Sequence, residues 1–151
     1  MEQKPLLRLR SLSVNFPGPG RILQAVRDLD LDVPPYAISC LVGESGCGKS
    51  LTCRAILRLT PEYAVLGGSI DFGSRDLLSL PEREMRRIRG ASIGAIFQEP
   101  MTSLNPVMTV GRQTAEPLRL HLGMDRKEAA AKVIDLFRQV GIPSPETRFN
   151  D

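Results

Sequence analysis

The fold of this chain is indicated by one stretch of its sequence, Gly43-Glu44-Ser45-Gly46-Cys47-Gly48-Lys49-Ser50. The stretch matches the pattern of a phosphate-binding P-loop, in which a lysine and a hydroxyl residue follow the second of two glycines. The glycines allow tight wrapping, so that backbone N–H groups converge on phosphate oxygens in front of the helix that follows. Lys49 supplies charge for the β- and γ-phosphates, Ser50 a hydroxyl for Mg²⁺, and Leu51 its backbone N–H. The stretch therefore predicts a nucleotide site formed by the residues from Gly43 to Leu51.

The segments beside this loop have the composition that a P-loop requires. Residues 37–42 form a short uncharged run, which is typical of a strand buried on both faces. Residues 49–59 repeat apolar side chains at helical spacing. Because the motif lies between a predicted buried strand and a predicted helix, an ordinary glycine turn is a poor explanation for it.

Two alternating segments near the start of the chain predict an antiparallel pair of strands. Residues 6–16 and 26–33 alternate apolar with polar side chains on either side of a Pro/Gly turn at residues 17–20. The first of these strands is expected to have a break near Ser11.

Five further elements are expected after residue 60, and the helix at residues 125–140 has the clearest pattern. Asp125 and Glu128 form a variant of the capping box, Glu128 and Lys132 have the spacing of an ion pair, and Gly141 is placed to end the helix. Its apolar face is expected to hold Ala130, Val133, Ile134, Phe137 and Val140. The other elements are strands at residues 67–72 and 93–97 and helices at residues 81–89 and 109–122, the last in spite of Pro117.

Composition narrows the class of protein. The chain has 151 residues, 42% of them hydrophobic, and a net charge of +3 from 20 basic and 17 acidic side chains. This balance is typical of a globular chain, and no apolar run approaches the roughly 20 residues of a membrane helix. Aromatic residues make up only 5%, which argues against base stacking on a nucleic acid.

The start of the chain and its cysteines point to a reducing compartment. Residues 1–12 carry charges and have no apolar core, so they do not resemble a secretory signal. Cys40, Cys47 and Cys53 lack metal-binding spacing and suit reduced thiols in a cytosolic protein. Cys40 is expected to be buried, because it lies on the strand predicted before the P-loop.

A second motif closes the strand expected at residues 93–97, and with it the sequence resembles a known family. The motif, downstream of the P-loop, is Ile96-Phe97-Gln98-Glu99-Pro100-Met101-Thr102-Ser103-Leu104-Asn105-Pro106. Together the two motifs resemble those of the ATP-binding cassette (ABC) ATPases. More narrowly, the sequence resembles the ATPase subunits of bacterial importers of dipeptides, oligopeptides and glutathione. The resemblance extends from about Leu6 to the end of the chain.

This resemblance implies roles for individual residues. Gln98 corresponds to the Q-loop glutamine, which in the family reaches Mg²⁺ and the attacking water and links the nucleotide site to the transmembrane subunits. An amide oxygen suits that role, since it accepts hydrogen bonds and coordinates cations. Phe16 has the position of the aromatic residue that stacks on adenine. The implied catalytic residues are Lys49 and Gln98, the implied metal ligands are Ser50 and Gln98, and the implied cofactors are ATP and Mg²⁺.

The fold class that follows is α/β, a P-loop NTPase core of the ABC type that is incomplete as a cassette. Residues 1–36 are expected to form an N-terminal antiparallel β-layer, which residues 67–72 join. Residues 37–99 are expected to form the P-loop core as far as the Q-loop. Residues 100–151 are expected to begin a helical subdomain.

The resemblance also implies a function and partners. The chain is expected to be the ATP-binding subunit of a transporter that imports peptides or similar small solutes, powered by ATP binding and hydrolysis. Its implied partners are transmembrane permease subunits and a second ATP-binding subunit, identical or different. A solute-binding protein is an indirect partner, and no nucleic acid is expected as a partner. The implied location is the cytoplasmic face of the bacterial inner membrane, as a peripheral protein.

Three elements of the family do not occur in these 151 residues: the Leu-Ser-Gly-Gly signature, the strand ending in Asp-Glu, and the switch histidine. The single histidine, His121, suits a helix surface. The 151 residues alone are therefore expected not to hydrolyse ATP. Two alternatives stay open, namely a truncated nucleotide-binding module without turnover and a small P-loop kinase or GTPase, although the guanine motif Asn-Lys-x-Asp does not occur.

Overall fold

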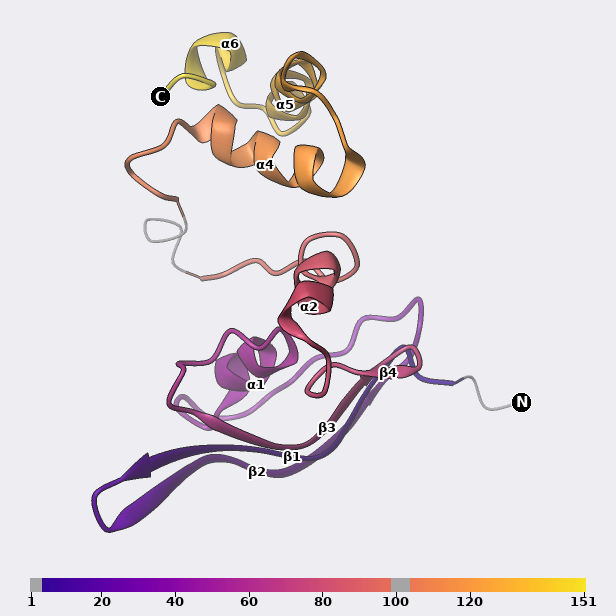
Figure 1. Cartoon of the computed structure of the whole chain (residues 1–151), viewed down its shortest axis with the longest axis vertical. Coiled ribbons are helices and arrows are strands. Elements are labelled where there is room, and N and C mark those ends of the chain that lie inside the picture. Colours follow the sequence, from indigo (N-terminus) through magenta and orange to yellow (C-terminus); the bar gives the residue numbers. More distant parts are fainter. Residues whose placement is uncertain (1–3, 99–103) are drawn as a thin grey trace. The chain divides into compact units, whose positions relative to one another are not determined.

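The computed structural model describes residues 4–98 and 104–151 of the chain (Figure 1). The chain divides into two compact units, Met1–Arg86 and Arg87–Asp151. The first unit is built around a sheet and the second around packed helices, and helix α2 (Glu82–Ile88) crosses the division. In the described ranges, no helix is both long and apolar enough to cross a membrane.

The sheet of the first unit is antiparallel, with its strands in the order β2-β1-β3-β4. Strands β1 (Leu7–Gly18) and β2 (Arg21–Val33) form the hairpin that the two alternating segments predict. Strand β3 (Val65–Phe72) pairs with the other edge of β1, and the short β4 (Arg75–Asp76) pairs with β3 (Figure 1). Strand β1 is thus hydrogen-bonded along both edges.

The apolar core of the first unit combines side chains of the sheet with those of the helices. Helix α1 (Lys49–Ile56) contacts β1 and β2 and buries Thr52 and Ala55. The hydroxyl of Thr52 donates a hydrogen bond to the carbonyl of Gly48 at 3.0 Å, which removes the cost of burying it. The buried apolar side chains of this unit are Leu9, Leu12, Val14, Val26, Ala55, Leu57, Ile70, Leu77 and Met85.

Strand β1 has a bulge at the expected break near Ser11. Leu9 pairs with Leu31 and Leu12 pairs with Leu29, so β1 has one residue more than β2 between these pairs. Ser11 itself has a φ of 45°, outside the range of a regular strand. The extra residue keeps Leu9 and Leu12 both buried although they are three positions apart.

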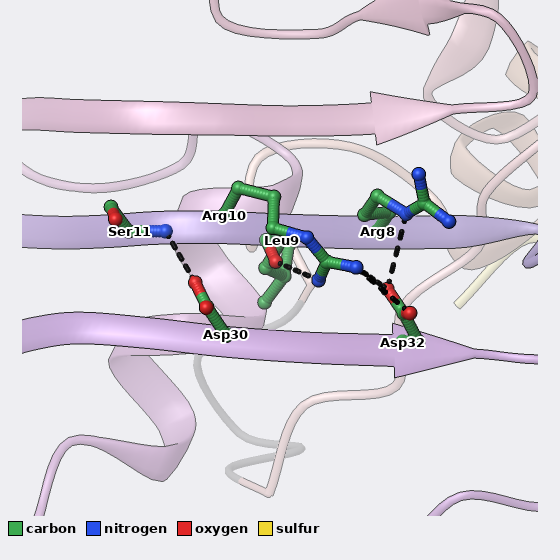
Figure 2. A network of polar contacts seen from close by, with 6 residues as sticks. All are labelled: Arg8, Leu9, Arg10, Ser11, Asp30 and Asp32. Atoms are coloured by element: carbon green, nitrogen blue, oxygen red, sulfur yellow. Dashed lines mark hydrogen bonds and ion pairs between the residues drawn. The ribbon is translucent and has the colours of Figure 1, made fainter.

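Two carboxylates of β2 hold the bulged part of β1 (Figure 2). Asp30 accepts a hydrogen bond from the backbone N–H of Ser11 at 2.6 Å. Asp32 accepts from Arg10 at 2.9 Å and from Arg8 at 3.3 Å, so two guanidinium groups share one carboxylate. The hydrogen bond from Arg10 holds the pKa of Asp32 below its ordinary value, because it favours the charged form.

The strand predicted at residues 37–42 is wrong. This segment has no regular structure, Ile38 is 94% exposed, and Val42 is exposed as well. A strand buried on both faces needs neighbours at its edges and a layer on each face. In the part of the chain that the structure describes, the strands of the sheet pair with one another and not with this segment. The expected burial of Cys40 is wrong for the same reason, since all three cysteines are free and exposed.

The strand predicted at residues 93–97 is also wrong. Ile93 forms an isolated parallel bridge with Arg89, and Ile96 and Phe97 are exposed. Apolar, β-branched residues favour a strand only where a partner strand accepts the backbone hydrogen bonds. Among the described residues, only Ile93 of this segment forms a β-bridge.

The second unit packs helix α4 (Val110–Leu122) against helix α5 (Arg126–Gln139), with α6 (Pro145–Arg148) against α5. The helix predicted at residues 109–122 is confirmed, with Thr109 as its N-cap and Pro117 inside it. The core of this unit is the cluster Ala115, Ala129, Val133 and Phe137. The predicted apolar face of α5 is therefore partly wrong, because Ala129 is fully buried where Ala130 was expected, and Val140 lies exposed at the end of the helix.

The start of α5 has the predicted capping box. The Asp125 carboxylate accepts from the N–H groups of Lys127 and Glu128, and the Glu128 carboxylate accepts from the N–H of Asp125 at 3.0 Å. The predicted pair of Glu128 with Lys132 is wrong, because Glu128 turns back to the cap and Lys132 pairs with Asp135 at 3.2 Å.

The exposure of residues 37–42 can be tested with two isoleucines that differ in burial. Ile70→Ala is expected to lower the free energy of unfolding by about 2–5 kcal/mol, because Ile70 is fully buried. Ile38→Ala is expected to change it by less than about 0.5 kcal/mol, since Ile38 already faces water. Urea unfolding followed by circular dichroism measures both, and equal losses would mean that residues 37–42 are buried.

The pair of arginines on Asp32 predicts an acid-sensitive contribution to stability. Because the folded state lowers the pKa of Asp32, the carboxylate stabilises the fold above its unfolded-state pKa, and this contribution is lost as pH falls through the folded-state pKa. Asp32→Asn is expected to lower stability at neutral pH and to flatten its decline in acid. Asp28→Asn, the same change of charge on the same strand, is the control and should leave the acid decline intact.

Candidate nucleotide site

The predicted phosphate loop leads directly into α1. Gly48 is the N-cap of this helix, with a φ of 93°, and no side chain caps the helix there. The N–H groups of the first helical turn therefore have no intrahelical acceptor and no side-chain acceptor. Such N–H groups, together with the positive end of the helix, form an arrangement that binds anions. Within the loop, the N–H of Cys47 donates to the carbonyl of Glu44 at 3.4 Å.

The loop is seated on β2 by a close backbone contact. A Cβ atom on Gly48 would lie 2.7 Å from the carbonyl oxygen of Ala25 and 3.1 Å from the Val26 side chain. Strand β2 is bulged at this point: Val14 pairs with Val26 and Asn15 with Gln24, which leaves Ala25 outside the register. Glycine is needed at position 48 for two reasons, a positive φ and the absence of room for a side chain.

Lys49 lies across its own loop. Its ammonium donates to the carbonyl of Gly43 at 2.8 Å and to the carbonyl of Glu44, and it lies 3.5 Å from the Cys47 sulfur. These acceptors are neutral dipoles, whereas a phosphate oxygen carries charge and forms a stronger hydrogen bond with an ammonium. The lysine is therefore held at the loop by contacts that a phosphate group can replace.

An aromatic side chain, Phe16, lies on the sheet face that Gly48 contacts. Val14 pairs with Val26, and Phe16 pairs with Leu23, on the same hairpin. Side chains two residues apart on a strand share a face, so Phe16 lies on the face of Val14, about 7 Å further along β1. Since Gly48 contacts Val26, the partner of Val14, the register assigns Gly48 and Phe16 to the same face of the sheet.

The other residues predicted for the nucleotide site follow the loop. Gly43, Glu44, Ser45, Gly46 and Cys47 are exposed, and so is Ser50, whereas Lys49 and Leu51 are half-buried. Ser50 is exposed in the first turn of α1. The loop, Ser50 and Phe16 all belong to the first unit, and their cooperation in one nucleotide site stays a prediction.

Gln98, the second predicted catalytic residue, is exposed and belongs to the second unit, whereas Lys49 and Ser50 belong to the first. Glu99, Pro100, Met101, Thr102 and Ser103 of the same motif lie outside the described residues. The cooperation of Gln98 with the phosphate loop stays a prediction.

Sequence reasoning missed two residues near these motifs. Tyr63 makes a ring contact with Phe16, with centroids 5.6 Å apart. Gln113 of α4 holds the end of the second motif: it accepts from the N–H of Asn105 at 2.7 Å and donates to the carbonyls of Asn105 and Met108, each at 2.9 Å. Neither residue belongs to a recognisable sequence pattern. The pairing register of β3 would be needed to indicate Tyr63, and the position of Gln113 in the first turn of α4 would be needed to indicate Gln113.

Comparison with known proteins shows the family of this chain. Residues 26–150 match the family model described as ABC transporter. A dipeptide transport ATP-binding protein of Bacillus subtilis is 45% identical over 145 residues, which are 95% of this chain and 43% of that protein. A peptidoglycan transport ATP-binding protein of Agrobacterium fabrum is 47% identical over 147 residues, 96% of this chain and 27% of that protein.

A solved structure shows the same fold. A dimeric bacterial ABC transporter cassette superposes with a TM-score of 0.79 at 20% sequence identity, over 96% of this chain and 60% of the cassette. The chain therefore belongs to the ABC transporter family, and the expected fold class, part of a P-loop ABC ATPase, is confirmed. The chain spans less than half the length of the two curated relatives described above.

Two glycines of the loop separate the effect of a positive φ from that of the close contact with β2. Gly46 has a φ of 82° with no atom near its missing Cβ, whereas Gly48 combines a φ of 93° with the contact to Ala25. Gly46→Ala is expected to cost about 1–2 kcal/mol of stability, the penalty of a left-handed conformation. Gly48→Ala is expected to cost more and to weaken phosphate binding further, because the loop must also move off β2. Urea unfolding and calorimetry with tripolyphosphate measure these effects, and equal losses would refute the role of the contact.

Proposed function

We propose that this chain forms the nucleotide-binding part of the ATPase subunit of a peptide-type ABC importer. One observation supports the proposal: Gly48 of the P-loop contacts Val26 of β2, whose partner Val14 shares its face of β1 with Phe16. The P-loop offers positive charge and N–H donors to the phosphates, and Phe16 offers an apolar ring to the base. A nucleoside triphosphate carries these two groups at its opposite ends.

The residues have separate tasks in this proposal. The loop amides and Lys49 bind the phosphates, and Lys49 exchanges its contacts with the loop carbonyls for charged oxygens. Ser50 and Gln98 supply oxygen donors for Mg²⁺, a cation that prefers oxygen ligands alongside water and phosphate. Both side chains are exposed, so each could present its oxygen to a cation. Phe16 stacks on adenine, and Gln98 orients the attacking water.

The wider function follows from the relatives. Their names describe dipeptide transport and peptidoglycan transport, which supports peptides or similar small solutes as cargo. The dimeric cassette supports pairing with a second ATP-binding subunit. We propose that the chain works with transmembrane permease subunits, and through them with a solute-binding protein, as a peripheral protein on the cytoplasmic face of the inner membrane.

Binding without turnover is proposed for these 151 residues alone. The signature and the Asp-Glu strand, which the family uses to clamp ATP and to polarise water, do not occur in the sequence. Preorganised charge of this kind acts mainly on the transition state, so its lack affects turnover more than binding.

Calorimetry with MgATP and with magnesium tripolyphosphate tests the two halves of the site separately. Lys49→Ala is expected to weaken both ligands about tenfold or more, because it removes charge-assisted hydrogen bonds. Phe16→Ala is expected to weaken MgATP alone by about 1–3 kcal/mol, the value of stacking a base on a ring. Lys132→Ala, in the second unit, is the matched control.

Three results would count against the proposal. Tripolyphosphate binding that is unchanged in Lys49→Ala would refute the proposed phosphate site. An equal effect of Phe16→Ala on both ligands would refute the proposed base site. Steady phosphate release that Lys49→Ala abolishes would refute binding without turnover.

A further inference from the structure

We propose that Tyr63 is a positioning residue of the nucleotide site, which orients the Phe16 ring for a purine base. The inference rests on the proposed nucleotide binding and adds a residue from a different segment of the chain. Its basis is the ring contact between the two side chains, with centroids 5.6 Å apart and ring planes at 56°.

The register of the sheet creates this contact. Asn15 pairs with Val65 at the start of β3, so the chain enters the sheet beside Phe16. The turn before β3 is closed by a hydrogen bond from the N–H of Ala64 to the carbonyl of Pro61 at 2.9 Å. Tyr63 is inside this turn, and its backbone is therefore anchored on both sides.

The exposure of Tyr63 distinguishes this pair from core packing, although Phe16 is half-buried. Tyr63 is 68% exposed, whereas Phe137, an aromatic side chain of the second unit's core, is 5% exposed. Leu23, the cross-strand partner of Phe16, is exposed as well. Apolar and aromatic side chains thus form a surface at this end of the hairpin, on the sheet face that Gly48 contacts.

The geometry of the rings assigns the two residues different tasks. At a centroid separation of 5.6 Å the rings touch, so a base has no room between them. A purine can stack only on a ring face that stays open. Phe16 is on the sheet face that holds the P-loop, and Tyr63 reaches it from the turn, so Phe16 stacks on the base and Tyr63 restricts the rotation of the Phe16 ring.

The experiment compares MgATP with magnesium tripolyphosphate on the 151-residue chain. Tyr63→Ala is expected to weaken MgATP about threefold to tenfold, the value of an aromatic pair, and to leave tripolyphosphate affinity unchanged. Tyr63→Phe keeps the ring and should retain the original affinity. Tyr36→Ala removes the other tyrosine, which is also exposed, and should change neither ligand. In the Phe16→Ala background, Tyr63→Ala should cause no further loss of MgATP affinity.

Fluorescence gives a second measurement, because the chain has two tyrosines and no tryptophan. Tyr36→Phe leaves Tyr63 as the single emitting residue. MgATP should change this emission, after correction for adenine absorption with free N-acetyltyrosinamide, and tripolyphosphate should not.

The outcomes separate this inference from the proposed function. A chain that binds neither ligand, or binds them only independently of Lys49, overturns the nucleotide site and the role of Tyr63 with it. MgATP binding that depends on Lys49 and Phe16 but not on Tyr63 overturns the positioning role alone. An equal loss of both ligands in Tyr63→Ala, or Tyr63 emission that MgATP leaves unchanged, also overturns it.

Discussion

The contact of Gly48 with the bulged backbone of β2 is the constraint on which the site depends. It places the N-terminus of α1 against the sheet at a separation that admits no side chain at position 48. The contact lies where β1 pairs with β2. The register of that pairing therefore decides which side chains of the sheet lie beside the contact. The bulge at Ala25 is part of this arrangement, since it turns a strand carbonyl toward the glycine.

Around this contact, the first unit assembles two kinds of binding surface from segments that are distant in sequence. The loop and helix supply N–H groups and the Lys49 ammonium, which carbonyl groups of the loop hold in place. The hairpin end and the turn before β3 supply the rings of Phe16 and Tyr63. Charge recognition is thus local in sequence, whereas the aromatic surface depends on the pairing of β1 with both of its neighbours.

The two strands that were expected and did not form share one physical origin. The capping box at Asp125, the helix across Pro117 and the β1–β2 hairpin depend on neighbouring residues or on a short turn, and each forms as expected. The strands predicted at residues 37–42 and 93–97 depend on partners from elsewhere. Their apolar composition describes a segment suited to burial, but burial requires hydrogen-bonding neighbours that no local pattern can supply.

The sequence by itself determined the phosphate-loop motif, the family and the capping box of α5, because these are encoded in contiguous motifs whose spacing is set by backbone geometry. The β-bulges were largely beyond its reach, although a break near Ser11 could be expected. The tertiary structure alone decided that Gly48 meets β2, that Tyr63 touches Phe16, and that Ala129 replaces Ala130 in the core of the second unit. These are contacts between distant segments, and they follow from strand register and helix packing, in which a shift of one residue brings a different side chain into contact.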